Sequence, residues 1–316
     1  MIAYTGGKTA GHVMPLISII KENNEECIYV GFNNNIEEKI CINNSIKFIG
    51  MKKYPNKMKS ILLGYFYLEK VLKKYSISAI LASGGFVSIP LCMYAIKHMI
   101  PLYLVEANVV LGVVNKLFYP FCKKIFLSYE LNLKKGVLSG LPIRKIDEKR
   151  YSTIYDILII GGSLGSKVLC DAAIVLKDEF RVILLAGNYY DEYKNISNIT
   201  VIKYYENIYE LMKMSKIIIA RAGSSTSTEI FNINKPYVCI PSMNTKGNHQ
   251  YLNALHFYKN NGCILCLESE IDTLLLDMCK DIINNELLID NMKKAQNKMI
   301  VSNSTKIILE EIKWLL

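Results

Sequence analysis

The chain has 316 residues, of which 51% are hydrophobic and 21% charged, so an intrinsically disordered protein is excluded and two domains of ordinary size are expected. The formal net charge of +10 favours an anionic partner, such as a phosphate group, nucleic acid or an acidic lipid surface, although a Lys- and Asn-rich composition alone also produces it. The nine cysteines, an odd and scattered number, indicate buried reduced thiols rather than a disulfide framework.

The first half of the chain alternates short apolar runs with glycine or polar turns and helical patterns. Such runs are typical of fully buried parallel strands, and their alternation with helices predicts a doubly wound sheet. The apolar run 77–96 is long enough to span a membrane, but Ser, Gly and Pro residues interrupt it, so we expect a strand, a loop and a helix there. The predicted strands are residues 2–4, 27–30, 79–81, 102–105 and 124–127.

The same series begins again in the second half, with predicted strands at residues 157–160, 181–185, 200–203, 216–220 and 236–240. The polar stretch 147–152 separates the two series as a linker, so we expect domains at 1–147 and 148–316. The last segment, 306–316, is expected to be a helix that packs on its own domain or back on the N-terminal one. Cys263 and Cys266 form an isolated CxxC, so we interpret them as strand residues and predict no metal site.

Three glycine-containing loops, at residues 6–12, 161–165 and 223–226, lie between a predicted strand and the start of a helix. A helix N-terminus presents backbone N–H groups and the positive end of the helix dipole, so such a loop suits a phosphate group. Each loop taken alone is equally well explained as a tight turn. The first loop fits neither the dinucleotide fingerprint nor the P-loop, so the sequence does not favour NAD or ATP, and no cofactor is expected.

Seven segments, taken in order, resemble the motifs of the MurG family. Its members transfer GlcNAc from UDP-GlcNAc to lipid I, which gives lipid II in peptidoglycan synthesis. The segments extend from Thr5 to Ala254 at family-like spacing. They are Thr5-Gly6-Gly7-Lys8-Thr9-Ala10-Gly11-His12, Ser83-Gly84-Gly85-Phe86-Val87-Ser88, Glu106-Ala107-Asn108, Gly140-x-Pro142-Ile143-Arg144, Gly161-Gly162-Ser163-Leu164-Gly165-Ser166, Arg221-Ala222-Gly223-Ser224-x-Thr226-x-x-Glu229 and Gln250-x-x-Asn253-Ala254.

This resemblance implies the GT-B fold, in which two Rossmann-like, doubly wound parallel-sheet domains face a cleft and the C-terminal one holds most of the UDP-GlcNAc. The donor diphosphate would bind at Ser163 and the helix start 223–226, and Glu229 would hold the ribose hydroxyls. Tyr205 would contact the uracil through its backbone, and Gln250 would bind the sugar hydroxyls. The implied substrate-binding residues are Lys8, Thr9, Ala10, Gly11, Asn108, Arg144, Ser163, Tyr205, Gly223, Ser224, Ser225, Thr226, Glu229 and Gln250.

In the first domain, residues 9–11 and Asn108 would approach the sugar and the acceptor, and Arg144 would contact the donor near the hinge. The implied reaction displaces UDP by an acceptor hydroxyl, with inversion at the anomeric carbon and an oxocarbenium-like transition state. Helix N-termini and Arg can stabilise the leaving diphosphate without a metal, and the chain has no Asp-x-Asp motif. His12 is the candidate catalytic base, and a loop-stabilising hydrogen bond is the other interpretation of this residue.

Departures from the family pattern concern the acceptor more than the donor. Lys8 stands where the family has the third glycine of its first loop, so it crowds the loop or adds a positive charge. Val105 and Ala107 replace the His and Gln of the family's HEQN segment, and His249 replaces the acidic residue usual before the late Gln. These departures leave both lipid I and another acceptor open.

Residues 51–75 form the predicted membrane surface. Basic residues beside exposed apolar ones favour an anionic bilayer, whereas a helix whose apolar side faces the core is the alternative. With a membrane lipid as acceptor, and no signal peptide at the N-terminus, we expect a peripheral protein on the cytoplasmic face of the bacterial cell membrane. The lysines of this segment are Lys52, Lys53, Lys57, Lys59, Lys70, Lys73 and Lys74.

Other functions remain open from the sequence. A transferase of the same fold could glycosylate a diacylglycerol or a natural product. A UDP-GlcNAc 2-epimerase has a related two-domain fold, but it would need further acid–base carboxylates and histidines. A non-catalytic UDP-sugar-binding module would fit the changes at Val105 and Ala107. Nucleic acid is not expected as a partner, because no recognised binding module is present.

Overall fold

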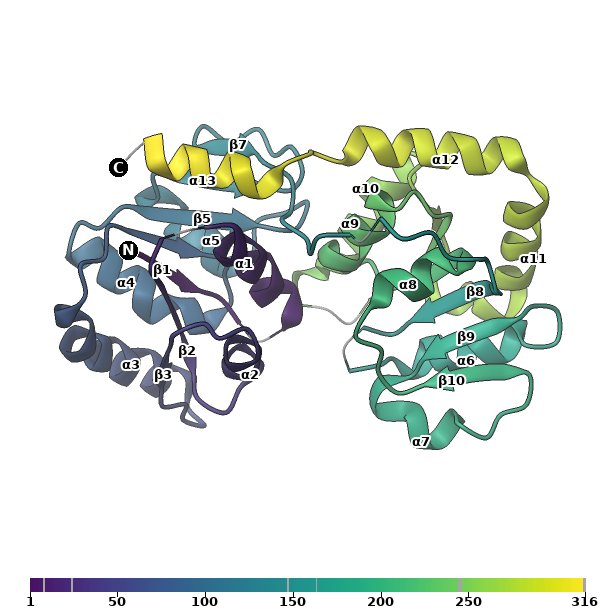
Figure 1. Cartoon of the computed structure of the whole chain (residues 1–316), viewed down its shortest axis with the longest axis horizontal. Helices are drawn as coiled ribbons and strands as arrows, with labels where there is room; N and C mark the ends of the chain where they lie inside the picture. Colours follow the sequence, from purple (N-terminus) through teal and green to yellow (C-terminus); the bar gives the residue numbers. More distant parts are fainter. Residues whose placement is uncertain (8, 24, 147, 163, 244–245, 315–316) are drawn as a thin grey trace. The chain divides into compact units, whose positions relative to one another are not determined.

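The computed structural model of the chain (Figure 1) describes all residues except 8, 24, 147, 163, 244–245 and 315–316. Its internal contacts divide the chain into two compact units, Met1–Arg144 with Val301–Leu316, and Lys145–Ile300. The sequence had suggested a division at 147/148, with the last segment in the second domain or packed back on the first. In the structure, the last segment belongs to the first unit.

The first unit is built on a seven-stranded sheet in which every strand pairs parallel to its neighbours. The strand order is β3-β2-β1-β4-β5-β6-β7, so the direction of winding reverses between β1 and β4. The strands are β1 (Ile2–Thr5), β2 (Cys27–Phe32), β3 (Phe48–Met51), β4 (Ala79–Ala82), β5 (Leu102–Glu106), β6 (Lys124–Leu127) and β7 (Gly136–Leu138).

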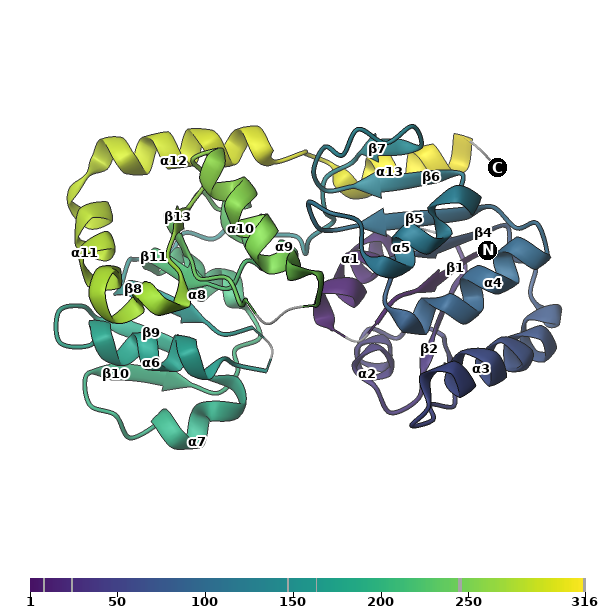
Figure 2. The same cartoon turned by 180° about the vertical axis from the view of Figure 1, so that it is seen from behind.

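Helices cover both faces of this sheet (Figure 2). One face carries α3 (Lys57–Val71), α4 (Ile89–Lys97) and α5 (Val113–Phe118), and the other carries α1 (Ala10–Glu22), α2 (Ile36–Asn43) and α13 (Ser304–Trp314). The last of these contributes Ile308, Leu309 and Ile312 to the core beside α1, which explains why the end of the chain belongs to this unit. Short 3₁₀ turns follow as η1 (Leu72–Lys74), η2 (Phe86–Ser88) and η3 (Tyr119–Phe121).

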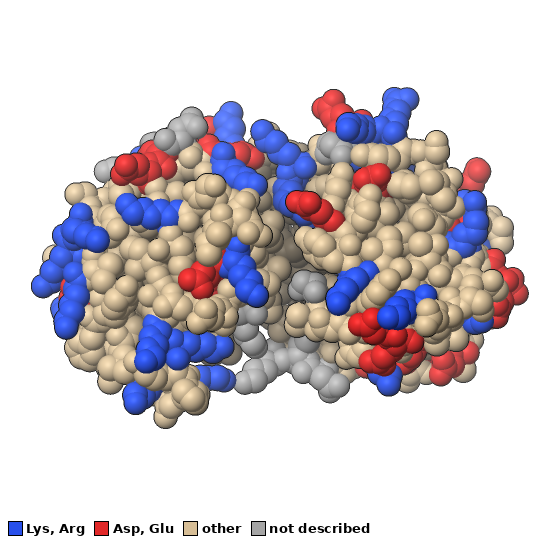
Figure 3. Space-filling view, turned by 60° about the horizontal axis from the view of Figure 1, so that its bottom comes forward, with Lys and Arg blue, Asp and Glu red and all other residues tan. Residues whose placement is uncertain are grey.

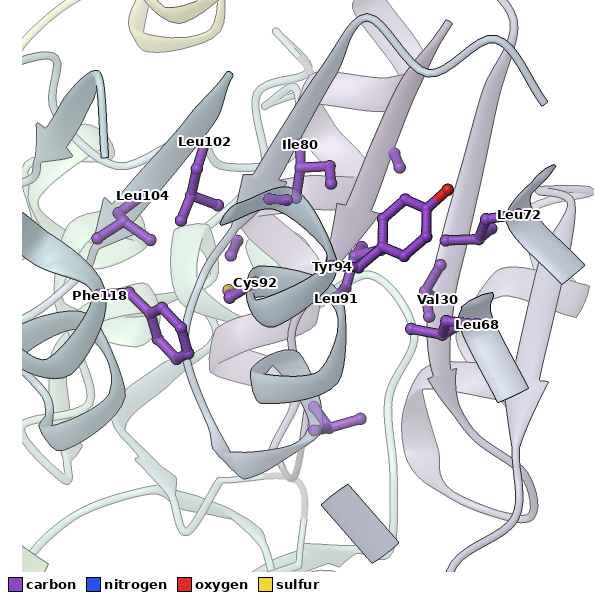
Figure 4. Packing of buried hydrophobic residues seen from close by; sticks show 14 of the residues in the cluster. Val30, Leu68, Leu72, Ile80, Leu91, Cys92, Tyr94, Leu102, Leu104 and Phe118 are labelled. Carbon is purple, nitrogen blue, oxygen red and sulfur yellow. The ribbon is translucent and has the colours of Figure 1, made fainter. Parts of the chain in front are cut away.

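The two cores of the first unit follow from the alternation of side chains along buried strands. Val30 and Ile80 point to the α3–α5 face, and their chain neighbours Tyr29 and Leu81 point to the α1 face. Figure 4 shows the α3–α5 core from close by, with Leu68 of α3, Leu91 and Cys92 of α4 and Phe118 of α5 packed over the strand residues. Because both faces are buried, the central strands β1 and β4 are fully buried and were recognisable as short apolar runs in the sequence.

The second unit repeats the plan with a six-stranded parallel sheet of order β10-β9-β8-β11-β12-β13. Helices α6 and α11 cover one face, where their apolar residues share a core with the strands. The strands are β8 (Tyr155–Ile160), β9 (Val182–Leu185), β10 (Ile199–Ile202), β11 (Ser215–Ala220), β12 (Tyr237–Cys239) and β13 (Ile264–Leu265). The helices are α6 (Lys167–Leu176), η4 (Gly187–Tyr189), α7 (Tyr190–Tyr193), α8 (Ile208–Lys213), α9 (Ser224–Asn232), η5 (Lys246–Asn248), α10 (His249–Lys259), η6 (Glu268–Glu270), α11 (Ile271–Asn284) and α12 (Glu286–Met299).

The ten predicted strands all exist, with ends shifted by at most two residues, and β3 and β7 were not expected. A strand does lie between Cys263 and Cys266, but the two cysteines themselves are not strand residues: they flank β13, which is two residues long and pairs with β12. The apolar run 77–96 forms β4, η2 and most of α4. In the part of the chain that the structure describes, no helix is long and apolar enough to cross a membrane.

Candidate active site

The two glycine loops of the first unit lie at its topological switch point. Strands β1 and β4 are neighbours, and ligands of open parallel sheets bind at the carboxyl ends of strands where the winding reverses. The first loop follows β1, and Ser83, Gly84 and Gly85 follow β4. A Cβ atom placed on Gly85 would lie 2.8 Å from the carbonyl oxygen of Gly7, so the two loops touch through their backbones.

The predicted base His12 is hydrogen-bonded to the second of these loops. Its Nδ1 lies 2.8 Å from the carbonyl oxygen of Ser83, and Ser83 Oγ donates at 2.6 Å to the carbonyl of His12. Because a carbonyl oxygen only accepts, Nδ1 carries the hydrogen, and the neutral ring then has its lone pair on Nε2. The pair joins positions 71 residues apart in the sequence. It fixes the tautomer and orientation that a proton acceptor at Nε2 requires.

Packing requires glycine at positions 6 and 7 of the first loop. A Cβ on Gly6 would lie 1.9 Å from Ser83 Oγ, and a Cβ on Gly7 would lie 2.8 Å from Cδ of the fully buried Glu37. In addition, Tyr29 Oη donates a 2.8 Å hydrogen bond to the Gly6 carbonyl. These contacts hold Gly6 and Gly7 against β2, α2 and the second loop.

A buried carboxylate organises the third loop of the first unit. Glu106, the last residue of β5, is 2% exposed. Its Oε1 accepts from the backbone N and Nδ2 of Asn108, both at 3.0 Å, and its Oε2 accepts from Gly112 N at 2.8 Å and Asn115 Nδ2 at 2.9 Å. Hydrogen bonds to a charged acceptor are stronger than neutral ones. The predicted residue Asn108 is therefore held in a loop that closes on Glu106 and leads into α5.

The loops after β8 and β11 flank the switch point of the second unit, because these strands are neighbours there. A Cβ on Gly162 or Gly223 would meet no atom of the described residues within 4 Å. Gly223 is the N-cap of α9, which has neither a side-chain cap nor an acidic residue in its first turn. Nearby, the buried Oγ of Ser225 has no hydrogen-bond partner among the described residues. A helix start with room beside it is suited to a phosphate group.

Arg221 joins three segments around this helix start. Its guanidinium donates to Ser166 Oγ at 2.9 Å and to the Ile240 carbonyl at 3.1 Å, and it pairs with Glu268 Oε1 at 2.5 Å. With 14% of its side chain exposed, the group is mostly removed from solvent. These contacts fix the glycine loop after β8 and the loop after β12 against the strand that leads into α9.

Helix α10 supports the same helix start from another side. Asn253 is fully buried, and its Nδ2 donates to the Ala222 carbonyl at 3.1 Å and to Ser224 Oγ at 3.2 Å. The predicted sugar ligand Gln250, one turn earlier, accepts a 3.0 Å hydrogen bond from Ser242 N through its amide oxygen. The amide nitrogen of Gln250 is therefore the end that carries donors for a ligand.

Two predicted nucleoside contacts lie on different elements. Glu229 of α9 accepts a hydrogen bond from Tyr209 Oη at 3.3 Å, which holds the carboxylate on the α8 side of the helix. Tyr205 follows the edge strand β10 and donates to Glu210 Oε2 at 2.9 Å, and this hydrogen bond raises the pKa of its hydroxyl. The structure thus places Glu229 on the helix that begins at Gly223, and Tyr205 on a loop at the sheet edge.

Some of the remaining predicted residues lie within the described part of the chain and two lie outside it. Lys8 and Ser163 lie outside the described residues. Thr9 is the N-cap of α1 and residues 10–11 open that helix, so all three adjoin His12. Arg144 is the half-buried last residue of the first stretch of the first unit.

Sequence reasoning gave no role to four residues that hold the site together, namely Ser83, Glu106, Arg221 and Asn253. Each stands within a motif that the sequence had singled out, and Glu106 was recognisable as an acidic residue that ends an apolar run. Their partners lie in other segments, so the sequence did not reveal what they bind. Among the described residues, no group of three or more His, Cys, Asp or Glu side chains is arranged to hold a metal ion.

Two doubly wound parallel-sheet units in one chain, each with glycine loops at its switch point, define the GT-B class of glycosyltransferase folds. The profile of the glycosyltransferase family 28 N-terminal domain matches residues 2–127, and that of the family 28 C-terminal domain matches residues 156–308. The chain belongs to glycosyltransferase family 28 and, within it, to the MurG family. It is therefore a glycosyltransferase.

Several relatives are similar to this chain over nearly their whole length. They are named UDP-N-acetylglucosamine--N-acetylmuramyl-(pentapeptide) pyrophosphoryl-undecaprenol N-acetylglucosamine transferase. The one from Clostridium botulinum strain Alaska E43 is 32% identical, covering 98% of this chain and 97% of the relative. The one from Sulfurihydrogenibium is 30% identical over 98% and 96%. The crystal structure of Acinetobacter baumannii MurG has a TM-score of 0.81 at 21% identity, over 99% of this chain and 98% of that one, which shows the shared fold.

Proposed function

We propose that this chain transfers GlcNAc from UDP-GlcNAc to the undecaprenyl-pyrophosphoryl-MurNAc-pentapeptide, and so converts lipid I to lipid II. The proposal is supported by relatives with this activity in their names that are 30–32% identical over 98% of the chain. In this chain, the main structural support is the start of α9, which has no side-chain cap. There, Gly223 leaves room for a diphosphate at the positive end of the helix dipole.

In the proposed donor site, the diphosphate of UDP-GlcNAc lies over Gly162 and Gly223. The backbone N–H groups at the start of α9 and the hydroxyl of Ser225 donate to its oxygens. Glu229 accepts from the ribose hydroxyls, and Gln250 donates through its amide nitrogen to a sugar oxygen. As the bond to the sugar breaks, negative charge grows on the leaving diphosphate, and donors already in place stabilise that charge without rearranging.

In the proposed reaction, the acceptor hydroxyl attacks the anomeric carbon from the face opposite to UDP. Its proton passes to Nε2 of His12, the bond between the anomeric carbon and the diphosphate oxygen breaks, and UDP leaves with that electron pair. The hydrogen bond from Nδ1 to the Ser83 carbonyl supports this role, because it keeps the lone pair on Nε2 and steadies the imidazolium that forms. The expected product has inverted configuration at the anomeric carbon.

The test is a transfer assay with radiolabelled UDP-GlcNAc and lipid I in detergent. The wild-type chain should move label to the lipid, and His12→Gln should lower kcat by about 10²–10⁴-fold, the range typical of a lost general base, while UDP binding is kept. His98→Gln is the matched control, because this exposed histidine of the first unit pairs with Glu69 on the outer helices. Release of UDP that is indifferent to the acceptor, or full activity of His12→Gln, would contradict the proposal.

A related transferase with another lipid acceptor is the second candidate. It is favoured by the changes from the family pattern at Val105 and Ala107, both beside the loop that Glu106 holds. A panel that offers lipid I and a diacylglycerol at equal concentration distinguishes the two, because the true acceptor alone should become labelled.

We further propose that α3 and the loop before it rest on the cytoplasmic face of an anionic membrane. The helix exposes Met58, Leu62, Leu63, Phe66 and Tyr67, which are 38–72% exposed, although its other side packs in the core through Leu68. Lysines surround this apolar surface, and Figure 3 shows groups of basic side chains on one face of the first unit. Apolar residues that enter the headgroup region and lysines that pair with acidic lipids are the features of an interfacial helix.

The membrane proposal is tested by sedimentation with phosphatidylglycerol vesicles. Replacing the exposed lysines Lys52, Lys53, Lys57 and Lys59 together by Ser should weaken binding strongly, since each basic residue near an anionic surface contributes about 1 kcal/mol. The control replaces four exposed lysines of the second unit, Lys203, Lys259, Lys294 and Lys298, which removes the same charge elsewhere. Equal loss in both variants would show attraction by net charge alone and would refute a specific surface.

A further inference from the structure

A second apolar surface lies on α5, apart from the one on α3. The inner side of this helix packs in the core through Val114 and Phe118. On the outer side, Val113 is 85% exposed, Leu117 56% and Phe121, in the following η3, 57%. The spacing of four residues places Val113 and Leu117 on one side of α5, and Phe121 follows in η3. We call these three residues the α5 stripe.

Lysines border the α5 stripe. Between residues 111 and 138 the chain has five lysines and a single acidic residue, Glu130. Lys116 and Lys123 are exposed beside the stripe, and Lys135 lies over the ring of Tyr119 at 5.8 Å and donates to the Pro120 carbonyl at 2.6 Å. A narrow apolar strip with positive charges along it suits a ligand that is apolar along its length and anionic at one end.

The α5 stripe begins where the third loop of the first unit ends. Gly112, the N-cap of α5, donates its N–H to Glu106, and Val113 is the next residue. From Val113 to Phe121 the chain takes eight residue steps through α5 and η3, about 12 Å at the α-helical rise, away from the loop that carries Asn108. In Figure 2, α5 lies beside α4 on the same face of the sheet as α3, the helix proposed to rest on the membrane.

We infer that the α5 stripe binds the isoprenoid chain of the acceptor lipid, in the part next to its pyrophosphate. This inference rests on the proposed function, which supplies a lipid-linked acceptor at the Asn108 loop. The pyrophosphate is placed near Lys116 at the start of the stripe, and the chain runs along Leu117 and Phe121 toward the bilayer. Three side chains are far fewer than the roughly 20–30 residues on each side of a stable protein interface, so a folded protein partner fits less well.

The inference predicts that the enzyme distinguishes acceptors by chain length. The experiment compares two acceptors with the same MurNAc-pentapeptide headgroup and pyrophosphate, one with an undecaprenyl chain and one with a single isoprene unit, which ends at the start of the stripe, both in detergent above its micelle concentration. For the wild type, kcat/KM should be higher with the long chain. The variant Val113→Ser/Leu117→Ser/Phe121→Ser should lose on the order of tenfold in kcat/KM for the long chain, which corresponds to about 1.4 kcal/mol, and keep its value for the short chain.

Two controls separate this effect from folding and from membrane attachment. Since the three positions are exposed, the variant should unfold at the wild-type urea concentration. Leu62→Ser/Phe66→Ser on α3 should reduce vesicle binding without changing the chain-length ratio in detergent. A ratio equal in the wild type and the α5 variant, or a wild type with no chain-length preference, would overturn the inference. Absence of transfer to either acceptor by the wild type would instead refute the proposed function.

Discussion

Replacing Gly223 by Ala separates folding from donor binding. Gly223 has φ −74° and ψ 126°, a conformation that Ala adopts without strain, and no described atom lies within 4 Å of the position that the new Cβ would take. Neither the backbone nor the packing of the second unit therefore requires glycine here. The remaining physical reason for it is the close approach of a ligand to the start of α9.

The expected change in folding free energy is small because two terms oppose each other. Ala restricts the unfolded chain more than Gly does and so stabilises by about 0.4–1 kcal/mol. At an N-cap, however, Ala is worse than Gly, by a similar amount on the order of 0.5–1 kcal/mol. The net change in the free energy of unfolding should lie within about 0.5 kcal/mol of zero. By contrast, a methyl group that displaces one charge-assisted hydrogen bond to the diphosphate costs about 1.5–3 kcal/mol of binding, or roughly 10- to 100-fold in Kd.

Calorimetric titration with UDP and urea unfolding measure the two quantities. The contrasting variant is Gly85→Ala in the first unit, where φ is +78° and the new Cβ would lie 2.8 Å from the Gly7 carbonyl oxygen. Gly85→Ala should lower the urea midpoint and leave the UDP affinity of the folded protein unchanged, which is the opposite outcome. Wild-type UDP affinity in Gly223→Ala would refute the assignment of the space beside α9 to the donor.

Two further predictions concern buried or paired carboxylates. In Glu106→Gln, an amide NH₂ faces N–H donors that the carboxylate accepted from. The kcat/KM for the acceptor should therefore fall at least about tenfold, whereas the Kd for UDP should stay unchanged. Steady-state kinetics and calorimetric titration measure these two quantities. Partial burial alone would raise the pKa of Asp156, but hydrogen bonds from Lys216 and Arg181 hold it at about 2, below its ordinary value of 3.8. The contribution of Asp156 to the free energy of unfolding is therefore present above pH 4 and lost as the pH falls through 2. Asp156→Asn should lower the free energy of unfolding at pH 7 by roughly 1 kcal/mol, after allowance for solvent screening. The stability of this variant in urea should also depend less on pH between pH 4 and 2 than that of the wild type.

The fold was predictable from the sequence where strands are buried on both faces. A central strand such as β8 must be apolar at almost every position, and this leaves an unmistakable run in the chain. The two unexpected strands lie at the sheet edges and are short: β3 contains a glycine, and β7 has three half-buried or exposed residues. At another edge, β13 has only two of the residues that the CxxC segment suggested. Edge strands carry less of the pattern because fewer of their side chains must be buried.

The site was predictable as a set of loops but not as a set of contacts. The sequence identified His12 and the second glycine loop. However, the hydrogen bonds between His12 and Ser83 join residues 71 positions apart and form because β1 and β4 are neighbours. Likewise, Glu106 was visible as a motif residue, whereas its four hydrogen bonds depend on how the loop folds back on it. Local patterns give the loops because each follows a strand; tertiary packing decides what each side chain binds.

The glycines of the two units show that similar glycine-rich motifs can serve different structural purposes. In the first unit, a side chain on Gly6 or Gly85 would collide with the neighbouring loop, so these glycines let two loops pack together. In the second unit, Gly162 and Gly223 have space where a side chain would stand, measured against the described residues. Substitutions at the first pair therefore act through folding and at Gly223 through ligand affinity. The glycines of the first unit thus allow two loops to pack together, whereas Gly162 and Gly223 leave space in the loops after β8 and β11.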